Sequence, residues 1–418
     1  MTTLLAVGDI HLGRTPAALH PDLSGRAAEL GPELAWSRAV TEAINRSVDA
    51  VVLAGDVVDR SRDLLVAYGD LKSGVDKLAT AGIPVLAVAG NHDTLVLPRL
   101  AREIEALHLL GGDGRWQEKT VGKLTVIGWS FPRPKVRQSP LKDFPQVSQP
   151  DRVIGLLHCD RDQADSPYAP VSSAELRAAP TAAWLLGHIH QPDDLADPRP
   201  IGYLGSLTAL RASETGPRGP WLVHWTGSAI QTRHLPLAPL RYENLPIDLS
   251  ALEAPEQLAE AALAAGRELA AQLSRAEMAP DVVGLRLALT GRCRFERELP
   301  QAADQLLNES RPWKDHGMVL FIQKVSVHTR PDFDLEQLAR QSDPCGLLAR
   351  RLLILSEHDH PEHRRLLDQG RLRLSRIAGL REFAAVDADL DDAAVRDWLE
   401  RAGQRALIEL IAQHRSGR

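Results

Sequence analysis

Six short apolar runs in the first 235 residues constrain the fold of this chain more than any other feature. They are TLLAV (3–7), AVVLA (50–54), IPVLAVA (83–89), LTVIGW (124–129), VIGLLH (153–158) and AAWLLG (182–187). Continuous apolar runs of this length are typical of strands that are covered on both faces. Amphipathic, helix-like stretches lie between them, at about 33–47, 64–81 and 98–107. Alternating strands and helices predict an α/β domain.

The chain has 418 residues, which is enough for two or three domains. The proline-rich stretch HLPLAPLRYENLPIDLSALEAPEQ (234–257) is typical of a linker that leaves the first domain. After it we expect a helix at about 256–275, then strands in VVGLRLALTGRC and MVLFIQKVSVHT that flank a helix near 297–309. The predicted domains are therefore an α/β domain (1–240), a small α+β domain (241–335) and a helical C-terminal region (336–418).

The charge and the cysteine content exclude several classes of protein. The net charge is -6, so no global field draws the chain to nucleic acid or to an anionic membrane, although a local basic groove is compatible with it. No stretch approaches the roughly 18 apolar residues of a membrane span, and the N-terminal MTTLLAVGDIHLG does not resemble a signal peptide. The three cysteines are widely scattered, which fits a reducing compartment. We therefore expect a cytoplasmic protein with no membrane partner.

Polar residues follow five of the apolar runs, at the strand ends where open α/β sheets place their sites. The blocks are GDIH, GDVVDR, GNHD, HCD and GHIH. They supply seven oxygen and nitrogen ligands: Asp9, His11, Asp56, Asn91, His158, His188 and His190. Glycines stand just before the ligands in four of the blocks, at 8, 55, 90 and 187. At such positions the backbone turns sharply or approaches an ion closely.

The ligand types predict a site for two metal ions. Two carboxylates, one amide and four imidazoles are too hard a set for Cu(I) or an iron–sulfur cluster, and the thiolates of structural zinc are missing. Seven ligands are too many for one tetrahedral ion, but they suffice for two ions that share a bridging carboxylate. Such a site stabilises the attacking and leaving oxygens of a displacement at phosphorus. Manganese fits this ligand set, and iron, zinc and magnesium are alternatives.

The series GDIH, GDVVDR, GNHD, H and GHIH resembles the calcineurin-like metallophosphoesterase superfamily over roughly the first 235 residues. The resemblance implies a four-layer α/β/β/α sandwich. It implies that one ion is held by Asp9, His11, Asp56 and His190. By the same resemblance the other ion is held by the bridging Asp56 together with Asn91, His158 and His188.

Five further residues have expected roles beside the metals. The resemblance makes His92 a catalytic group that neutralises charge on the phosphoryl group or protonates the leaving oxygen. Asp59 and Asp93 are candidates to orient His92 or other site groups, and local turn stabilisation is the alternative. Arg60 is a candidate to bind substrate phosphate, or else an exposed arginine at a helix start. Ser206, in the GS turn of IGYLGSLTALRASE, is a second candidate for substrate contact.

The stretch 201–214 and the exit into the second domain are similar to the SbcD-like DNA-repair nuclease branch. This resemblance implies a phosphodiesterase that hydrolyses DNA by attack of a metal-bridging hydroxide, with the second domain capping the nucleic-acid groove. It also implies a homodimer and an SMC-like, SbcC-like coiled-coil ATPase docked on the C-terminal helices. A phosphatase or small-nucleotide phosphodiesterase is the first alternative. A non-catalytic interaction scaffold is the second, and the complete ligand set speaks against it.

One apolar stripe is predicted on the last helix. Its members repeat at a spacing of three to four residues: Val395, Trp398, Leu399, Ala402, Ala406 and Leu410. The stripe has two interpretations, docking of the ATPase partner and packing onto the protein's own core.

Overall fold

The computed structural model describes residues 1–378 and 391–416. The chain forms two compact units. The first consists of Met1–Leu245, Leu263–Leu287 and Glu309–Lys324, and the second of Pro246–Ala262, Ala288–Asn308 and Val325–Arg418. None of the described helices is both long and apolar enough to cross a membrane.

Two mixed sheets form the centre of the first unit. The six-stranded sheet has the order β11-β10-β1-β2-β3-β4, with the bounds β1 Thr2–Val7, β2 Ala50–Leu53, β3 Val85–Ala87, β4 Leu107–Leu109, β10 Trp221–Trp225 and β11 Ile230–His234. The five-stranded sheet has the order β5-β6-β7-β8-β9, with the bounds β5 Gln117–Val121, β6 Leu124–Trp129, β7 Val153–His158, β8 Ala183–Gly187 and β9 Ile201–Tyr203. The strands β1 to β4 are parallel to one another, and so are β6 to β9.

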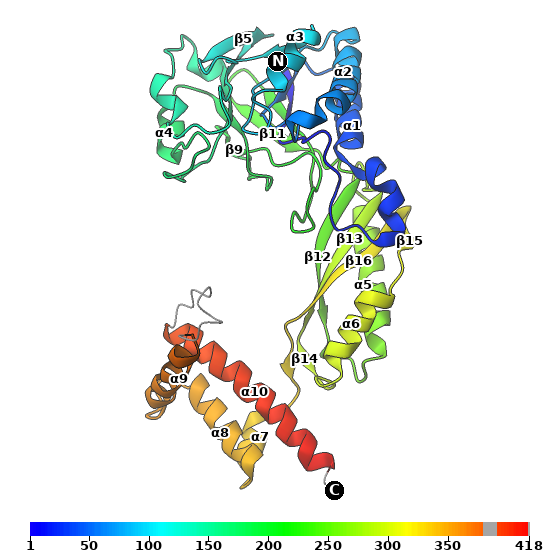
Figure 1. Cartoon of the computed structure of the whole chain (residues 1–418), viewed down its shortest axis with the longest axis vertical. Coiled ribbons are helices and arrows are strands. Elements are labelled where there is room, and N and C mark those ends of the chain that lie inside the picture. Colours follow the sequence, from blue (N-terminus) through cyan, green and yellow to red (C-terminus); the bar gives the residue numbers. More distant parts are fainter. Residues whose placement is uncertain (379–390, 417–418) are drawn as a thin grey trace. The chain divides into compact units, whose positions relative to one another are not determined.

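The alternation of side chains along the strands produces four layers. Leu5 faces helices α1 (Pro32–Asn45), α2 (Leu64–Thr80) and α3 (Leu97–Glu103), whereas its neighbour Leu4 belongs to the core between the two sheets. On the five-stranded sheet, Leu156 faces the core between the sheets, and Leu157 packs on the other side with Leu176 of α4 (Ser173–Ala178). Figure 1 shows α1 and α2 on one side of the sheets and α4 on the other. The predicted α/β/β/α sandwich is therefore confirmed.

Two stretches of this region differ from the prediction. The helix predicted to reach residue 107 ends at Glu103, and β4 follows because its backbone pairs with β3. The predicted linker contains a nine-residue strand, β12 (Leu240–Asp248). It is the edge strand of a four-stranded sheet in the order β12-β13-β16-β15. Proline has no backbone N–H group to donate. An edge strand tolerates Pro246, because one side of such a strand has no neighbouring strand to bond with.

The predicted strand–helix–strand outline after residue 241 is present. Its elements are α5 Gln257–Leu273, β13 Val282–Thr290, β14 Arg292–Cys293, α6 Leu299–Glu309, β15 Trp313–Asp315, β16 Met318–Val327 and β17 Arg330–Pro331. The boundary between the two compact units crosses β12, β13 and β16 part way along. The domain boundaries predicted after residues 240 and 335 stay predictions.

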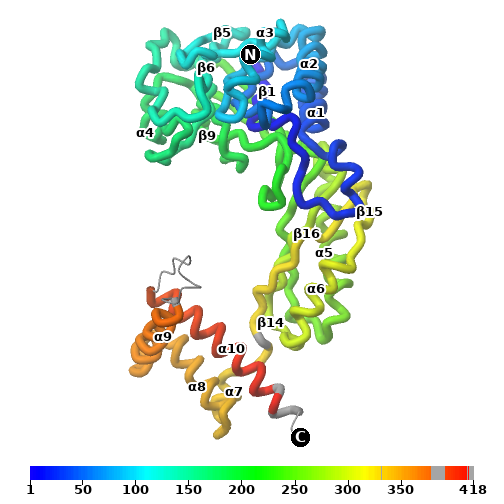
Figure 2. The backbone as a smooth tube through the Cα atoms, in the orientation of Figure 1, coloured from blue at the N-terminus to red at the C-terminus, as the bar shows by residue number. Residues whose placement is uncertain are grey.

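Helices α7 Leu335–Ala339, α8 Pro344–Ser356, α9 His363–Ala378 and α10 Asp392–Ser416 follow. Helices α8, α9 and α10 lie side by side (Figure 2). Val395 and Leu407 are fully buried in their core, and Leu399 packs against it. Packing onto the protein's own core therefore applies to only part of the predicted stripe, because Trp398 is 53% exposed and Ala402 and Ala406 are exposed. Of the predicted region 336–418, residues 379–390 and 417–418 lie outside the described residues.

Candidate metal centre

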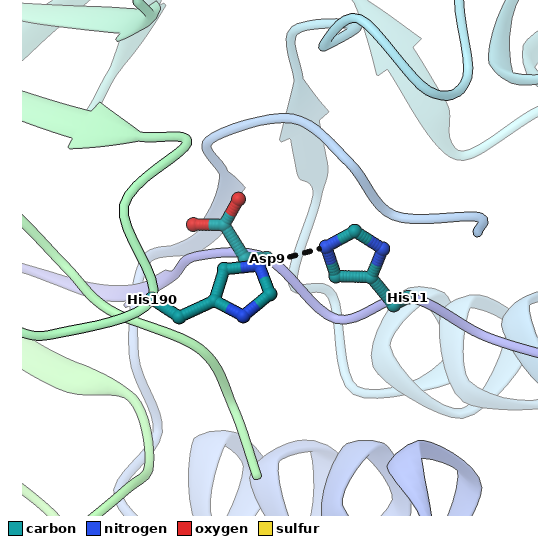
Figure 3. A group of neighbouring side chains, drawn as sticks. All are labelled: Asp9, His11 and His190. Atoms are coloured by element: carbon teal, nitrogen blue, oxygen red, sulfur yellow. Dashed lines mark hydrogen bonds between the residues drawn. The ribbon is translucent and has the colours of Figure 1, made fainter. Parts of the chain in front are cut away.

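The seven predicted ligands come together where five strands end. Asp9 and His11 follow β1, Asp56 follows β2, Asn91 follows β3, His158 ends β7, and His188 and His190 follow β8. Among the described side chains, three groups have ligand atoms within 4.8 Å of one another: Asp9, His11 and His190; Asp56, His158 and His188; and His11, Asp59 and His92. The first two groups contain six of the seven predicted ligands. Figure 3 shows the first of these groups. The parallel strand order explains the convergence, since parallel strands deliver their carboxyl ends to one edge.

Four of these residues have a positive φ angle, a backbone conformation that residues other than glycine rarely adopt. The φ angles are 35° at Asp9, 57° at His11, 48° at Asp56 and 106° at His188. Each such residue costs on the order of 1–3 kcal/mol, and such residues cluster at functional sites. The surrounding structure therefore holds these side chains in place at a cost in stability.

Glycines allow the close approach that the sequence predicted. A Cβ atom at Gly90 would lie 2.2 Å from Oδ1 of Asp56, and one at Gly187 would lie 2.0 Å from the carbonyl oxygen of Ala54. No larger residue fits at either position without movement of the backbone.

The rings of His11 and His190 turn unprotonated nitrogens toward each other. Nδ1 of His11 lies 3.0 Å from Oδ1 of Asp59, and Nδ1 of His190 lies 2.8 Å from Oε1 of Glu214. In neutral rings each Nδ1–H donates to its carboxylate, so both Nε2 atoms keep a lone pair. These Nε2 atoms are 3.1 Å apart (Figure 3). Two lone pairs at this distance repel, so the arrangement fits a shared cation next to Asp9.

A second set of lone pairs meets around Asn91. Nδ1 of His158 donates to the carbonyl of Ala54 at 3.0 Å, so its Nε2 is free of protons and lies 3.0 Å from Oδ1 of Asn91. Nε2 of His188 lies 3.2 Å from Oδ1 of Asp160, and its Nδ1 lies 3.1 Å from Oδ1 of Asn91. Burial lowers the pKa of His158 to about 4 and also lowers the pKa of His188, so both rings are neutral at pH 7. The donor set fits a second cation.

Asp56 lies between the two groups. Its Oδ2 is 3.4 Å from Nε2 of His158 and 4.0 Å from Nε2 of His11. Burial alone would raise the pKa of Asp56, but the neighbouring histidines outweigh it and lower the pKa. In contrast, burial and the charge of Asp56 raise the pKa of Asp9 well above its usual range. Two buried carboxylates whose negative charges repel are stabilised by positive charge beside them, as two divalent ions would supply.

His92 lies at the edge of the site with an exposed side chain. Its Nδ1 donates to the backbone carbonyl of Asp59 at 2.9 Å. The carboxylate of Asp59 pairs with His11 instead, and this hydrogen bond lowers the pKa of Asp59 to about 2. Asp59 therefore orients His92 through its backbone and His11 through its side chain.

The carboxylate of Asp93 contacts backbone groups beside the site. It is fully buried and accepts hydrogen bonds from the backbone N–H groups of Val57 at 2.7 Å and Gly90 at 2.8 Å. Of the two expected roles, orientation of His92 or other site groups and local turn stabilisation, these contacts agree with the second. Its carboxylate ties the GNHD block to the GDVVDR block, because these N–H groups lack other partners.

The two candidates for substrate contact differ in exposure. The Arg60 side chain is 61% exposed, and its Nε lies 3.2 Å from Oδ2 of Asp59, so its contact with substrate stays a prediction. Ser206 is 1% exposed, and its backbone N–H donates to the carbonyl of His190 at 2.9 Å. This burial does not fit the expected substrate contact. Ser206 instead supports the loop that carries His190.

Three residues that support the site were missed from the sequence. Glu214 holds His190 and also accepts from the backbone N–H of Leu210 at 2.7 Å. Arg218 is 1% exposed and donates to the carbonyl of His190. Asp160 pairs with His188. Only Asp160 lies inside a predicted block, HCD, whereas Glu214 and Arg218 lie 24 and 28 residues after His190.

Comparison with known proteins agrees with this geometry. A family model described as calcineurin-like phosphoesterase matches residues 2–192, and one described as metallophosphoesterase YhaO, middle domain, matches residues 242–330. The uncharacterized metallophosphoesterase YhaO of Bacillus subtilis is 27% identical over 220 residues, which are 50% of this chain and 54% of that protein.

A second group of relatives consists of DNA double-strand break repair proteins. Mre11 of Haloferax volcanii is 29% identical over 270 residues, which are 62% of this chain and 57% of that protein. The chain thus spans about half the length of the curated relatives it matches. Among solved structures, a dimetal phosphatase from Danio rerio aligns with a TM-score of 0.34 and 13% identity, over 55% of this chain and 96% of that one.

Proposed function

We propose that the chain is a metallophosphoesterase that hydrolyses phosphodiester bonds in DNA, because residues 2–192 match the family model described as calcineurin-like phosphoesterase. The observation that carries the proposal is the pair of lone-pair clusters on either side of Asp56. The choice of DNA is supported by the similarity to proteins named for DNA double-strand break repair.

Two divalent ions are part of the proposal. Asp9, His11, Asp56 and His190 would hold one, and Asp56, Asn91, His158 and His188 the other. Bound ions would acidify water and offset the charge that develops on the phosphoryl oxygens. Manganese is our choice of metal, because the mixed oxygen and nitrogen set suits it.

The chain's own residues orient the substrate and move protons. His92 is exposed, and its Nδ1–H is held by the carbonyl of Asp59, so its Nε2 is free to approach substrate. A proton on Nε2 would reach the leaving oxygen or a nonbridging phosphoryl oxygen. Arg60, which is exposed beside Asp59, would bind a neighbouring phosphate.

The proposal is tested by manganese-dependent cleavage of a labelled DNA duplex, with Asp56→Ala as the control. Cleavage by the wild type that is lost in the variant supports it. The same protein is assayed on single strands and on bis(p-nitrophenyl) phosphate. Metal-dependent hydrolysis of the small diester without cleavage of any DNA would favour the second candidate, a small-nucleotide phosphodiesterase.

We also propose that the protein is a homodimer. Leu65, Val66 and Leu95 are 81%, 55% and 59% exposed. Leu65 also lines a hollow between α2 and α3, together with Tyr68 and Leu100. Burial of such side chains against a second copy would remove them from water. Sedimentation of the wild type and of Leu65→Asp tests this, because a monomeric wild type would refute it.

An ATPase partner docked on the C-terminal helices is a further proposal. Leu347, Leu372, Ile377 and Trp398 are 50%, 57%, 49% and 53% exposed on α8, α9 and α10. Co-purification of a coiled-coil ATPase with the wild type, and its loss with Leu372→Asp, would support this proposal.

We also propose a cytoplasmic location. The three cysteines are all buried and free, which supports it.

A further inference from the structure

A segment with several cations and no acids follows β6. Residues 130–142, SFPRPKVRQSPLK, contain three arginines or lysines within five positions (Arg133, Lys135 and Arg137) and a fourth at Lys142. They contain no Asp or Glu, although the chain as a whole has a net charge of -6. We call 130–142 the basic segment.

The strand register places the start of the basic segment beside the metal centre. The strands β6, β7 and β8 are parallel, with Trp129 opposite Leu157 and His158 opposite Gly187. The chain therefore leaves β6 at the level where β7 and β8 deliver His158 and His188.

Hydrogen bonds and ring contacts hold the basic segment against the site. The ring of Phe131 lies 5.7 Å from that of His158, and the backbone N–H of Phe131 donates to the carbonyl of Ala89 at 3.1 Å. Ala89 stands two residues before Asn91, so one end of the segment touches the ends of both β3 and β7.

A second anchor lies further along the segment. The N–H of Val136 donates to the carbonyl of Pro167 at 2.7 Å, and the N–H of Ala169 donates to the carbonyl of Val136 at 2.7 Å. Tyr168, between these two partners, has its ring 5.1 Å from that of His188. The middle of the basic segment is thus connected to the second metal group.

The cations themselves face solvent. Val136 is buried, whereas Arg133, Lys135 and Arg137 are exposed. Within residues 1–378 and 391–416, none of the three forms an ion pair, and Arg137 donates only to the backbone carbonyl of Asp165.

The neighbouring loop contains three acidic residues, Asp160, Asp162 and Asp165, and within the described residues none of them forms an ion pair with Arg133, Lys135 or Arg137. The carboxylate of Asp160 pairs with His188, and that of Asp162 accepts from the backbone N–H of Ser173 at 2.7 Å. The segment therefore presents positive charge at an edge of the metal centre.

We propose that Arg133, Lys135 and Arg137 bind backbone phosphates of the DNA strand that enters the metal centre. The inference rests on the proposed function, because it assigns part of the substrate path to that site. Exposed, unpaired cations beside a phosphoesterase centre fit consecutive phosphates, and such contacts position a strand without reading its sequence. These cations would also explain how a protein with a net negative charge binds DNA, because they attract the phosphates locally.

The test compares Arg133→Ser/Lys135→Ser with the wild type in its metal-loaded form. Arg137 is kept because it holds the carbonyl of Asp165. The matched control is Lys77→Ser/Lys123→Ser, which removes two exposed cations near the amino ends of β3 and β6, away from the strand ends that form the site. Each protein is assayed for duplex binding at several salt concentrations, for KM on duplex DNA and for hydrolysis of bis(p-nitrophenyl) phosphate.

In the basic-segment variant, KM for DNA should rise while hydrolysis of the small diester stays at the wild-type rate. The slope of log binding constant against log salt should become shallower by roughly 1.8, which is about 0.9 for each phosphate contact removed. An unchanged slope and KM, or an equal change in the control variant, would overturn the inference and leave the proposed function standing. A wild type that neither binds nor cleaves DNA, but hydrolyses the small diester, would overturn both.

Discussion

Nδ1 of His190 lies 2.8 Å from a carboxylate oxygen of Glu214, so this ring offers Nε2 to the metal centre. His188, two residues earlier, has the opposite arrangement, because its Nε2 pairs with Asp160 and its Nδ1 faces Asn91. The two histidines of the GHIH block would therefore serve different ions with different ring nitrogens. Carboxylates that hold the far nitrogen of a ligand histidine fix its tautomer and its orientation.

Replacement of Glu214 should weaken one metal site more than the other. Glu214→Ala removes the acceptor for the Nδ1–H of His190, and we expect a roughly 10–100-fold loss of affinity for one of the two ions. Calorimetric titration with manganese measures this loss, because at low manganese concentration the variant should bind one ion per chain rather than two. Glu214→Gln keeps an acceptor oxygen and should lose less. Equal losses in the two variants would contradict the role in orientation.

Asp160→Ala should have the matching effect on the other site. It removes the acceptor for Nε2–H of His188, which frees the ring to present the wrong nitrogen to Asn91. We expect a loss of affinity of similar size, roughly 10–100-fold, for one ion. In the double variant Glu214→Ala/Asp160→Ala both ions should bind weakly. If the double variant bound one ion with wild-type affinity, the two carboxylates would serve the same site.

His92→Ala should reduce turnover but preserve metal binding. The ring is exposed and is held by the carbonyl of Asp59, outside the two lone-pair clusters. Loss of a proton donor costs roughly 10²–10⁴-fold in rate. Cleavage of a labelled DNA duplex measures the rate, because its alkoxide leaving group needs a proton, and metal analysis of the purified variant measures occupancy. A variant with normal turnover, or one that loses a metal ion, would show that the assigned role is wrong.

Gly90→Ala should destabilise the fold and the second metal group together. The added Cβ would lie 2.2 Å from Oδ1 of Asp56, so the backbone of one block has to move. We expect a loss of about 1–3 kcal/mol in the free energy of unfolding, measured by urea denaturation in chelator. Gly25→Ala is the matched control, because a Cβ there meets no atom within 4 Å. Similar stability of the two variants would contradict the steric argument.

His234→Gln should reduce the acid sensitivity of the fold. Burial lowers the pKa of His234 to about 4, from its usual 6.5. Between these values the unfolded chain binds a proton that the folded chain does not, so the free energy of unfolding falls as the pH drops through this window. The contribution is at most about 3 kcal/mol, since one pKa unit corresponds to about 1.4 kcal/mol.

Urea denaturation of metal-free wild type and His234→Gln at about pH 7 and about pH 4.5 measures this contribution. Gln keeps a donor for the carbonyl of Gly219, which His234 contacts at 3.3 Å. The variant should lose less stability than the wild type over this interval. Parallel losses in the two proteins would assign the acid sensitivity to other groups, such as His158.

Much of the fold and the seven candidate ligands were predictable because the relevant signals are local. An apolar run such as 153–158 identifies a strand by itself, and a polar block directly after it identifies a strand end. Strand β12 was missed for the converse reason. Pro239 directly precedes this strand and Pro246 lies within it, so the sequence resembles a linker. Pro246 is acceptable in a strand only because β12 pairs with β13 at the edge of the sheet.

Local patterns of residues are enough to predict that five strands end in oxygen and nitrogen ligands, because strand and ligand are adjacent in the chain. Which nitrogen each histidine presents depends on the folded structure. Glu214 reaches His190 from 24 residues away, and the Asp93 carboxylate holds Val57 from 36 residues away. Hydrogen bonds of this kind depend on where the folded backbone places two distant atoms, and no local pattern of residues records that distance.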